Sequence, residues 1–344
     1  MANNHYICAT FFQKSSMKNI LGLGNALVDA LVMVHDEAFL QQLCLQKGAM
    51  QLVDNERFHN ISQITSALHC ELRTGGSAAN VTLCAARLGE KSVFCGKPGQ
   101  DCNSSFFRQE MMRNGVHVVP LSGGLPMGVA STFITPDGQR TFATYLGAGA
   151  TLAASELQPA WFEGAGYAFI EGYLVQDHAL IETAIGMARR AGAKVCLDLA
   201  SYNIVADNRS YFLRLLENTD IVLANEEESH ALTGLAPTAA LDALAAMCPV
   251  AVVKVGAKGA MARRGQEHAS VEAVKVPGVV DTTAAGDFFA AGFLVASLRG
   301  ASLADALRLG AHCSAEVIQV VGTRLPEAAW SRLRLVAAEC TSAS

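Results

Sequence analysis

The 344-residue sequence contains no uncharged apolar run of about 18 residues, so no transmembrane helix is expected. It has no excess of positive charge: 26 lysines and arginines stand against 31 aspartates and glutamates, and no basic block occurs. A nucleic-acid or anionic membrane partner is therefore not favoured. Residues 1–16 lack the basic start and the long apolar stretch of a signal peptide. We expect them to be a disordered extension before a natural start at Met17.

Cysteine is present but not in groups. The ten cysteines are scattered, with no C-x-x-C and no cluster with histidine. A structural zinc site or a disulfide framework needs tighter spacing. The pattern therefore predicts buried free thiols in a reducing cytoplasm.

Two common nucleotide-binding loops are also missing. No G-x-x-x-x-G-K-[ST] sequence occurs, and Gly256-Ala257-Lys258-Gly259 does not have that spacing. Gly22-x-Gly24 begins like a dinucleotide-binding fingerprint, but Leu27 occupies the third glycine position. A P-loop enzyme is therefore excluded, and a nicotinamide-dependent enzyme is a poor interpretation.

What the sequence does contain is an alternation of short apolar runs and helical patterns. The predicted buried strands are 20–23, 92–95, 168–171, 195–198, 221–224 and 250–255. The predicted helices are 77–88, 104–114, 177–191, 208–217, 226–246, 285–299, 302–321 and 327–340. Such alternation predicts an α/β fold with a mostly parallel central sheet flanked by helices on both faces.

A smaller β-rich part is expected beside this sheet. Residues 129–134 and 141–146 flank a turn at Pro136-Asp137-Gly138 and predict a hairpin. Residues 30–56 suggest half-exposed strands around a short helix near 37–44. We therefore predict one large α/β domain over residues 17–344, with a lid built from two segments near 30–74 and 116–150.

The most informative segment is Asp281-Thr282-Thr283-Ala284-Ala285-Gly286-Asp287, which leads into an apolar helix. Small residues allow consecutive backbone N–H groups to face an anion at a helix N-terminus. A carboxylate just beyond the turn can accept a proton from an attacking hydroxyl. The segment therefore favours phosphoryl transfer over the alternative of a merely well-capped helix.

Polar residues elsewhere could hold the other reactant. Gly75-Gly76-Ser77-Ala78-Ala79-Asn80 combines a turn that allows close approach with an amide that can bind hydroxyl groups, although a helix cap explains it about as well. Asn25 and Asp29 follow the first strand, where ligands of open α/β sheets bind. Asn225 and Glu228 can form a capping box or hold the waters of a Mg²⁺ ion.

In chain order these motifs resemble the ribokinase-like (pfkB-type) family of sugar and nucleoside kinases, from about residue 18 onward. Residues 75–80, with Gly89, Gly96 and Gly99, look like its N-terminal signature, and residues 281–294 look like its C-terminal signature. The resemblance implies a ribokinase-like fold that uses ATP and Mg²⁺, with a monovalent cation such as K⁺ as a further candidate. It also implies a small-molecule acceptor and a monomer or homodimer.

The resemblance also assigns roles. Asp287 would be the catalytic base, and the backbone of Ala284, Ala285 and Gly286 would hold the transferring phosphoryl group. The predicted acceptor-binding residues are Asn25, Asp29, Gly75, Gly76, Ser77, Asn80 and Tyr173. The predicted nucleotide-binding residues are Asn225, Lys254, Gly256, Gly259, Thr282 and His312, and Asn225 and Glu228 would bind Mg²⁺ through water.

One position departs from the family, which usually has Gly-Ala-Gly-Asp where this chain has Ala284-Ala285-Gly286-Asp287. An alanine at the first position costs about 1 kcal/mol or more if a left-handed conformation is required there. We expect an intact site. A non-catalytic nucleotide or sugar sensor is the alternative that Ala284 motivates.

The acceptor is expected to be a nucleoside, with adenosine first. Residues 24–29 (Gly-Asn-Ala-Leu-Val-Asp) are similar to the Gly-Asn-Pro-Leu-Leu-Asp pattern of adenosine kinases. Met50 and Tyr173 fall where a glutamine and a phenylalanine are usual, although Tyr173 can stack on a ring. The alternative is a sugar kinase acting on fructose, ribose or a keto-deoxy sugar acid. For an acid, Arg140 in the hairpin is the candidate partner, although an exposed hairpin charge explains this arginine better.

Overall fold

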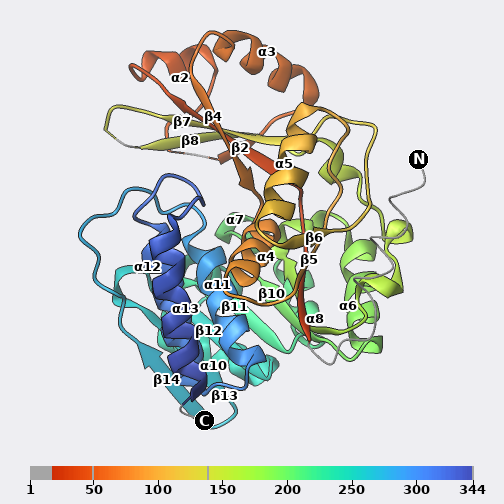
Figure 1. Ribbon diagram of the computed structural model, residues 1–344, viewed down its shortest axis with the longest axis vertical. Coiled ribbons are helices and arrows are strands. Elements are labelled where there is room, and N and C mark those ends of the chain that lie inside the picture. Colours follow the sequence, from red (N-terminus) through yellow and green to blue (C-terminus); the bar gives the residue numbers. More distant parts are fainter. Residues whose placement is uncertain (1–17, 49, 138, 343–344) are drawn as a thin grey trace.

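Two sheets organise the computed structural model, which describes residues 18–48, 50–137 and 139–342 (Figure 1). The predicted extension at residues 1–16 lies outside these residues. The large sheet has nine strands in the order β14-β13-β12-β11-β10-β9-β1-β5-β6. They are β1 (Asn19–Leu23), β5 (Ser92–Cys95), β6 (Val116–Val118), β9 (Ala165–Glu171), β10 (Lys194–Asp198), β11 (Ile221–Asn225), β12 (Val250–Lys254), β13 (Ala260–Arg264) and β14 (Glu267–Val271). Neighbours from β6 to β12 are parallel, and β12, β13 and β14 are antiparallel.

Helices cover both faces of the large sheet, which confirms the predicted α/β class. One face carries α4 (Ser77–Arg87), α5 (Cys102–Arg113), α11 (Ala285–Leu298), α12 (Leu303–Val317) and α13 (Glu327–Ser342). The other carries α6 (His178–Arg190), α7 (Tyr202–Asp207), α8 (Arg209–Leu216), α9 (Glu226–Thr233) and α10 (Pro237–Met247). Strand residues alternate between the two cores because successive side chains point to opposite faces, as Ile20 and Leu21 do.

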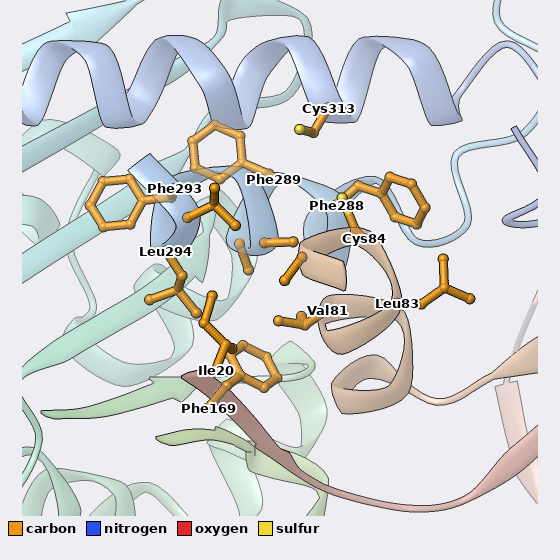
Figure 2. Packing of buried hydrophobic residues seen from close by; sticks show 14 of the residues in the cluster. Ile20, Val81, Leu83, Cys84, Phe169, Phe288, Phe289, Phe293, Leu294 and Cys313 are labelled. Atoms are coloured by element: carbon orange, nitrogen blue, oxygen red, sulfur yellow. The ribbon is translucent and has the colours of Figure 1, made fainter. Parts of the chain in front are cut away.

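The face that carries α11 is packed with aromatic side chains. Phe288, Phe289 and Phe293 of α11 are buried below α12 (Figure 2). Phe289 packs against Gly310 of α12, and Phe288 stacks on Trp330 of α13 with ring centroids 5.9 Å apart. Full burial of such side chains stabilises the fold by about 1.5–3 kcal/mol each. The start of α11 is therefore held in a fixed position relative to the sheet.

The small sheet lies above this body (Figure 1). Its order is β3-β8-β7-β2-β4. The strands are β2 (Leu27–Met33), β3 (Met50–Leu52), β4 (Cys70–Gly75), β7 (Gly128–Ile134) and β8 (Arg140–Tyr145). Helices α2 (Ala38–Gln42) and α3 (Asn55–Thr65) cover one of its faces through a separate apolar cluster. The β7–β8 pair is the predicted hairpin, with Gly138 of its turn outside the described residues.

Several expected elements are different in the structure. The single helix predicted over 226–246 is two helices, because Gly234 adopts a left-handed φ of 78° and Pro237 starts a new helix. Helix α12 ends at Val317, four residues before the prediction. Helix α3 and the hairpin β13–β14 were not predicted. Strand β6 belongs to the large sheet, so the second segment of the small sheet begins at β7 rather than at residue 116.

The carboxyl ends of the parallel strands meet at one edge of the large sheet, below the small sheet. Paired positions such as Glu171 with Asp198 and Asn225 with Lys254 bring polar residues together there. Ligands of open α/β sheets bind at this edge. In the described part of the chain, no helix is both long enough and apolar enough to cross a membrane.

Candidate active site

The turn before α11 has the geometry of an anion-binding site. Ala284 is the N-cap residue and has a left-handed conformation, with φ 60° and ψ 7°. The Ala285 amide makes a long bond of 3.3 Å to the Thr282 carbonyl. The amides of Ala284, Gly286 and Asp287 have no acceptor among the described residues. Free N–H groups at a helix N-terminus favour a negatively charged ligand.

Asp287 lies in the first turn of α11, where two residues of α4 hold its carboxylate. Ser77 Oγ donates to Oδ1 at 2.7 Å, and Asn80 Nδ2 donates to Oδ2 at 2.8 Å. Burial raises the pKa of Asp287, and these two hydrogen bonds act in the opposite direction. A half-buried, oriented carboxylate with a raised pKa has the properties of a general base.

Asp281 holds the turn before α11 in place through hydrogen bonds from two backbone amides. Its Oδ1 accepts from the Thr283 amide at 2.7 Å, and its Oδ2 accepts from the Gly322 amide at 2.7 Å. Arg140 of β8 also reaches this carboxylate, with Nη1 2.5 Å from Oδ1, and donates to Thr283 Oγ1 at 2.9 Å. Arg140 is therefore not an exposed hairpin charge, because it links the small sheet to the anion-binding turn.

Glu171, at the end of β9, organises the neighbouring cleft wall. Its Oε1 accepts from the backbone amide and the Nδ2 of Asn25, both at 2.7 Å, and its Oε2 accepts from the Ala78 amide at 3.1 Å. Burial raises the pKa of Glu171 to about 7, despite these hydrogen bonds. Asn25 is thus fixed beside the start of α4 by a carboxylate that the sequence analysis did not identify as a site residue.

Asp29 and the two glycines of residues 75–76 pack closely beside Asn25. Burial raises the pKa of Asp29 to about 7, and the charges of Asp287 and Asp281 add to this effect. A Cβ atom on Gly75 would lie 2.5 Å from Asp29 Oδ1. Gly76 has a φ of 93°, and a Cβ there would lie 2.3 Å from the Asn25 carbonyl oxygen. Glycine is therefore required at both positions by close approach.

The predicted nucleotide side contains a cation and two carboxylates. Lys254 Nζ lies 3.2 Å from Asp198 Oδ2, and a Cβ on Gly286 would lie 3.2 Å from the same Nζ. The ammonium group therefore lies directly beside the anion-binding turn. Burial raises the pKa of Glu228 to about 7, while Lys254 acts in the opposite direction.

Asn225 and Glu228 form a reciprocal capping box at the start of α9. Asn225 Oδ1 accepts from the Glu228 amide at 2.8 Å, and Glu228 Oε2 accepts from the Asn225 amide at 2.8 Å. Asn225 Nδ2 also donates to Glu228 Oε1 at 2.7 Å. These bonds give both residues a structural role, which is compatible with holding metal-bound waters. Within the described ranges no group of three or more His, Cys, Asp or Glu residues could hold a metal ion directly.

The remaining predicted residues are less closely joined to this cluster. Tyr173 lies after β9, where its hydroxyl donates to the Ala200 carbonyl at 3.2 Å. Burial raises the pKa of Tyr173, and the charges of Asp198 and Asp287 add to the effect. Gly259 has a φ of 102°, and a Cβ there would lie 1.9 Å from the Val271 carbonyl oxygen, so its backbone conformation and the approach of β14 both require glycine. Thr282 is exposed on the turn.

Gly256 and His312 have no direct link to the Asp287 cluster. Gly256 has a left-handed φ of 55°, and a Cβ would meet open space there. His312 lies half-buried on α12, and its charged neighbours are Arg308, Glu316 and Glu339. Burial lowers the pKa of His312, with Arg308 adding to the effect.

The arrangement as a whole suits phosphate chemistry. Free amides and a lysine lie together at the start of α11, and the Asp287 carboxylate lies in the same turn. Asp29 and Asn80, whose side chains can bind hydroxyl groups, lie near this carboxylate. A cavity of about 500 Å³ is lined by Arg140 and Phe142 on one side and residues 279–283 on the other, so it lies beside the turn and not among these polar groups. Oxygen donors at Asp198, Asn225 and Glu228 are of the kind that holds hydrated Mg²⁺.

Sequence reasoning missed Glu171 and Asp198 for the same reason. Each is the last residue of a buried strand, and the strand pattern was read as core. An acidic residue at the carboxyl end of a strand in a parallel sheet is the signal that could have identified both.

Comparison with known proteins agrees with this geometry. The model of the pfkB family of carbohydrate kinases matches residues 46–330. The chain is 29% identical to a ribokinase from Arabidopsis thaliana over 286 residues, which is 78% of this chain and 73% of that protein.

Two solved structures are similar over most of the chain. A probable sugar kinase from Rhizobium etli has a TM-score of 0.85 and 31% identity, covering 93% of this chain and 99% of its own. The adenosine kinase from Sinorhizobium meliloti has a TM-score of 0.84 and 32% identity, with the same coverage.

Proposed function

This chain belongs to the pfkB family of carbohydrate kinases and is a phosphotransferase with an alcohol group as acceptor, and we propose that it transfers the γ-phosphoryl group of ATP to the primary hydroxyl of a ribofuranosyl nucleoside. Adenosine is the first candidate. Asp287 is the general base, and the turn at Ala284–Gly286 receives the transferring group.

One observation carries this proposal: the Asp287 carboxylate lies at the same helix N-terminus as the free amides of Ala284 and Gly286. A hydroxyl that donates its proton to Asp287 is therefore next to the point where an anion is stabilised. Base and anion site must be adjacent for in-line transfer. The Lys254 ammonium group beside Gly286 adds a positive charge at the same point.

The proposed acceptor site combines residues 25–29 with the first residues of α4. Asp29, Asn25 and the backbone of Gly76 offer hydrogen-bonding groups to vicinal ribose hydroxyls. Ser77 and Asn80 keep the Asp287 carboxylate oriented toward the remaining primary hydroxyl. The pKa of Asp287 is raised by burial, so its proton affinity is closer to that needed at neutral pH.

The nucleotide and its metal ion belong on the side of Lys254. Lys254 and the free amides of the turn bind phosphate oxygens, and Asn225 and Glu228 orient waters of Mg²⁺. When bound, Mg²⁺ neutralises charge on the phosphates during transfer. Gly256 leaves open space for a nucleotide at the end of β12. The Thr282 and His312 contacts remain part of this proposal.

The small sheet supports an acceptor that carries a base. Across the sheet Asp29 pairs with Ala130, Ala130 with Thr144, and Thr144 with Leu52, so all four side chains share one face. Leu52 is 54% exposed on this face, and Met50, its neighbour on β3, is 40% exposed. Free ribose has no group to cover these apolar side chains, whereas a nucleobase does.

A free sugar is the second candidate because of Glu171. Its buried carboxylate fixes Asn25 close to the sugar site, and the ribokinase from Arabidopsis thaliana is among the relatives of this chain. The same chemistry would then phosphorylate ribose or fructose.

An ATP-consumption assay against a panel of nucleosides and free sugars tests the proposal. We expect turnover with adenosine at low acceptor concentration and little with ribose or fructose. Turnover with a sugar alone would replace the nucleoside assignment by the second candidate. ATP binding without transfer to any acceptor would contradict the kinase assignment and indicate a sensor.

A further inference from the structure

A second cavity lies between β4, α4, α5 and the start of α13, and we propose that it binds a small phosphate ligand, either inorganic phosphate or a phosphate monoester. Its volume is about 260 Å³. We call it the arginine cavity, because its lining includes Arg73, Arg87, Arg113 and Arg324. Elements β4, α4, α5 and α13 contribute to its walls, together with residues 323–325.

The charges around the arginine cavity do not cancel. Glu110 pairs with both Arg113 and Arg324, while Glu327 pairs with both Arg87 and Arg334. Arg73 pairs with Glu71. Within the lining itself, four guanidinium groups stand against the carboxylates of Glu110 and Glu327, which leaves an excess of two positive charges. A dianionic phosphate group would balance them.

Two donors in the wall lack acceptors. The Nε atoms of Arg73 and Arg87 are buried and have no hydrogen-bond partner among the described residues. Buried donors without partners are rare, because their desolvation is not compensated. Guanidinium groups in this situation match the oxygens of phosphate, which accept charge-assisted hydrogen bonds.

The rest of the lining has room for a small organic group. Trp330 lies under the Arg87 guanidinium, whose Cζ is 5.1 Å from the ring centroid. Phe106 and Leu325 add apolar surface. The volume is just below the range of about 300–1,000 Å³ that is typical of pockets for drug-sized ligands. A sugar phosphate is therefore a suitable size.

The arginine cavity is separate from the anion-binding turn. Two of its lining residues nevertheless belong to segments that contact Asp29 and Asp281. Thr74 lines the cavity and precedes Gly75, which contacts Asp29. Thr323 also lines it and follows Gly322, whose amide donates to Asp281. A ligand in the cavity therefore contacts two segments that hold the site in place.

Fluorescence of Trp330 provides a direct test. The sequence contains two tryptophans, and a Trp161→Phe background leaves Trp330 as the only reporter. Titration with inorganic phosphate and with ribose 5-phosphate is expected to change its emission with saturation. Tighter binding of ribose 5-phosphate identifies a monoester site, and equal binding identifies a site for the bare phosphate group.

Variants locate the bound anion. Arg73→Gln and Arg87→Gln should each weaken binding by about tenfold or more, the loss expected for a charge-assisted hydrogen bond. Arg332→Gln is the matched control on α13, since Arg332 pairs with Glu316 away from the cavity. Lys254→Gln tests the anion-binding turn instead. Both of these variants should bind as the parent does.

Several results would overturn the proposal. One is the absence of any saturable signal, by fluorescence or calorimetry. Another is unchanged affinity in folded Arg73→Gln and Arg87→Gln variants. Loss of binding in Lys254→Gln alone would also overturn it, because the anion would then occupy the turn before α11. If either variant fails to fold by circular dichroism, Arg324→Gln at the exposed rim takes its place, with the same expected loss.

Discussion

Asn80 donates a hydrogen bond of 2.8 Å to the Asp287 carboxylate, although the two residues are 207 positions apart. The bond joins the first turn of α4 to the first turn of α11. Both helices begin at the edge of the large sheet where the parallel strands end, and both are held there by buried apolar contacts. The position of the proposed base is therefore a property of the packed core and not of a local loop.

The first prediction concerns Asp287→Asn. The substitution keeps the shape and removes the proton acceptor, so kcat should fall by about 10²–10⁴-fold, the usual contribution of general base catalysis. The melting temperature should not fall, because a half-buried carboxylate with a raised pKa is replaced by a neutral group. Steady-state kinetics and thermal melting check both parts. Asp207→Asn, at an exposed position, is the control. Near-normal turnover in Asp287→Asn would refute the assignment.

The second prediction concerns the left-handed residue before α11. Ala284 has a φ of 60°, which costs a non-glycine residue about 1–2 kcal/mol. Ala284→Gly relieves this strain, although glycine gains about 0.4–1 kcal/mol of conformational entropy in the unfolded chain. The free energy of unfolding should therefore rise by up to about 1 kcal/mol, as measured by urea denaturation.

Ala285→Gly is the matched control for this experiment. Ala285 is the first helical residue, so glycine there should lower the free energy of unfolding by up to about 1 kcal/mol. Opposite signs at adjacent positions would separate backbone strain from a general effect of glycine. A loss of stability in Ala284→Gly would contradict the left-handed conformation.

The parts of the fold that could be predicted were those with a strong local pattern. The buried strands, the β7–β8 hairpin and most helices follow from apolar periodicity. The break between α9 and α10 was missed because Leu232 and Leu241 continue one apolar pattern across Gly234 and Pro237. Strand β6 was misassigned because three residues carry too little pattern to identify their sheet.

The site could be predicted where one segment contains its own chemistry. Residues 281–287 combine an anion-binding turn with a carboxylate, so their proximity is set by the sequence itself. Glu171 and Arg140 act on residues more than 90 positions away, namely Asn25, Ala78, Asp281 and Thr283. Such pairs depend on the order of the strands and on the packing of the small sheet, and neither can be predicted from a local sequence pattern.

The third prediction uses the pKa of Glu171. Burial raises it to about 7, so the folded protein binds a proton that the unfolded chain releases above about pH 4.5. Stability from this group is therefore greatest at acidic pH and is lost as pH rises toward 7. The expected loss is on the order of 3 kcal/mol. Glu171→Gln removes this dependence.

The measurement is the difference in unfolding free energy between the two proteins at pH 5, 6, 7 and 8. This difference isolates Glu171 from other titrating groups, including His312, whose lowered pKa has the opposite effect on stability. Relative to Glu171→Gln, the parent protein should lose stability as pH rises. Glu217→Gln at an exposed position should leave the profile unchanged. A flat difference between parent and Glu171→Gln would show that Glu171 stays ionised throughout.

The fourth prediction separates the catalytic and structural roles of Lys254. Lys254→Met removes the cation beside Gly286, so kcat/KM for ATP should fall at least about tenfold. It also leaves Asp198 unpaired, which should cost about 3 kcal/mol of stability. Adding Asp198→Asn should restore stability but not activity. Lys258→Met, in the exposed turn after β12, is the control for loss of a lysine. Activity that recovers together with stability would assign Lys254 a structural role alone.

The last prediction concerns the ion pair between Arg140 and Asp281, which joins the small sheet to the anion-binding turn. The Asp281 side chain is fully buried, and Arg140 is 15% exposed. Removing the guanidinium leaves a buried carboxylate held only by two amides, which lowers the free energy of unfolding. Removing both charges changes this free energy little. Arg140→Gln should therefore lower the free energy of unfolding by about 3 kcal/mol, and Arg140→Gln/Asp281→Asn should recover much of it.

A double-mutant cycle measured by urea denaturation should give a coupling energy well above that of the exposed pair Arg264–Glu267. That pair is a matched control, because exposed ion pairs contribute about 0–1 kcal/mol. The turn also depends on Asp281 for its shape, since Asp281 accepts from the Thr283 and Gly322 amides. The double variant should therefore regain stability yet remain less active than the parent. Equal coupling in the two cycles would mean that Arg140 is solvated and that the small sheet is not tied to the turn.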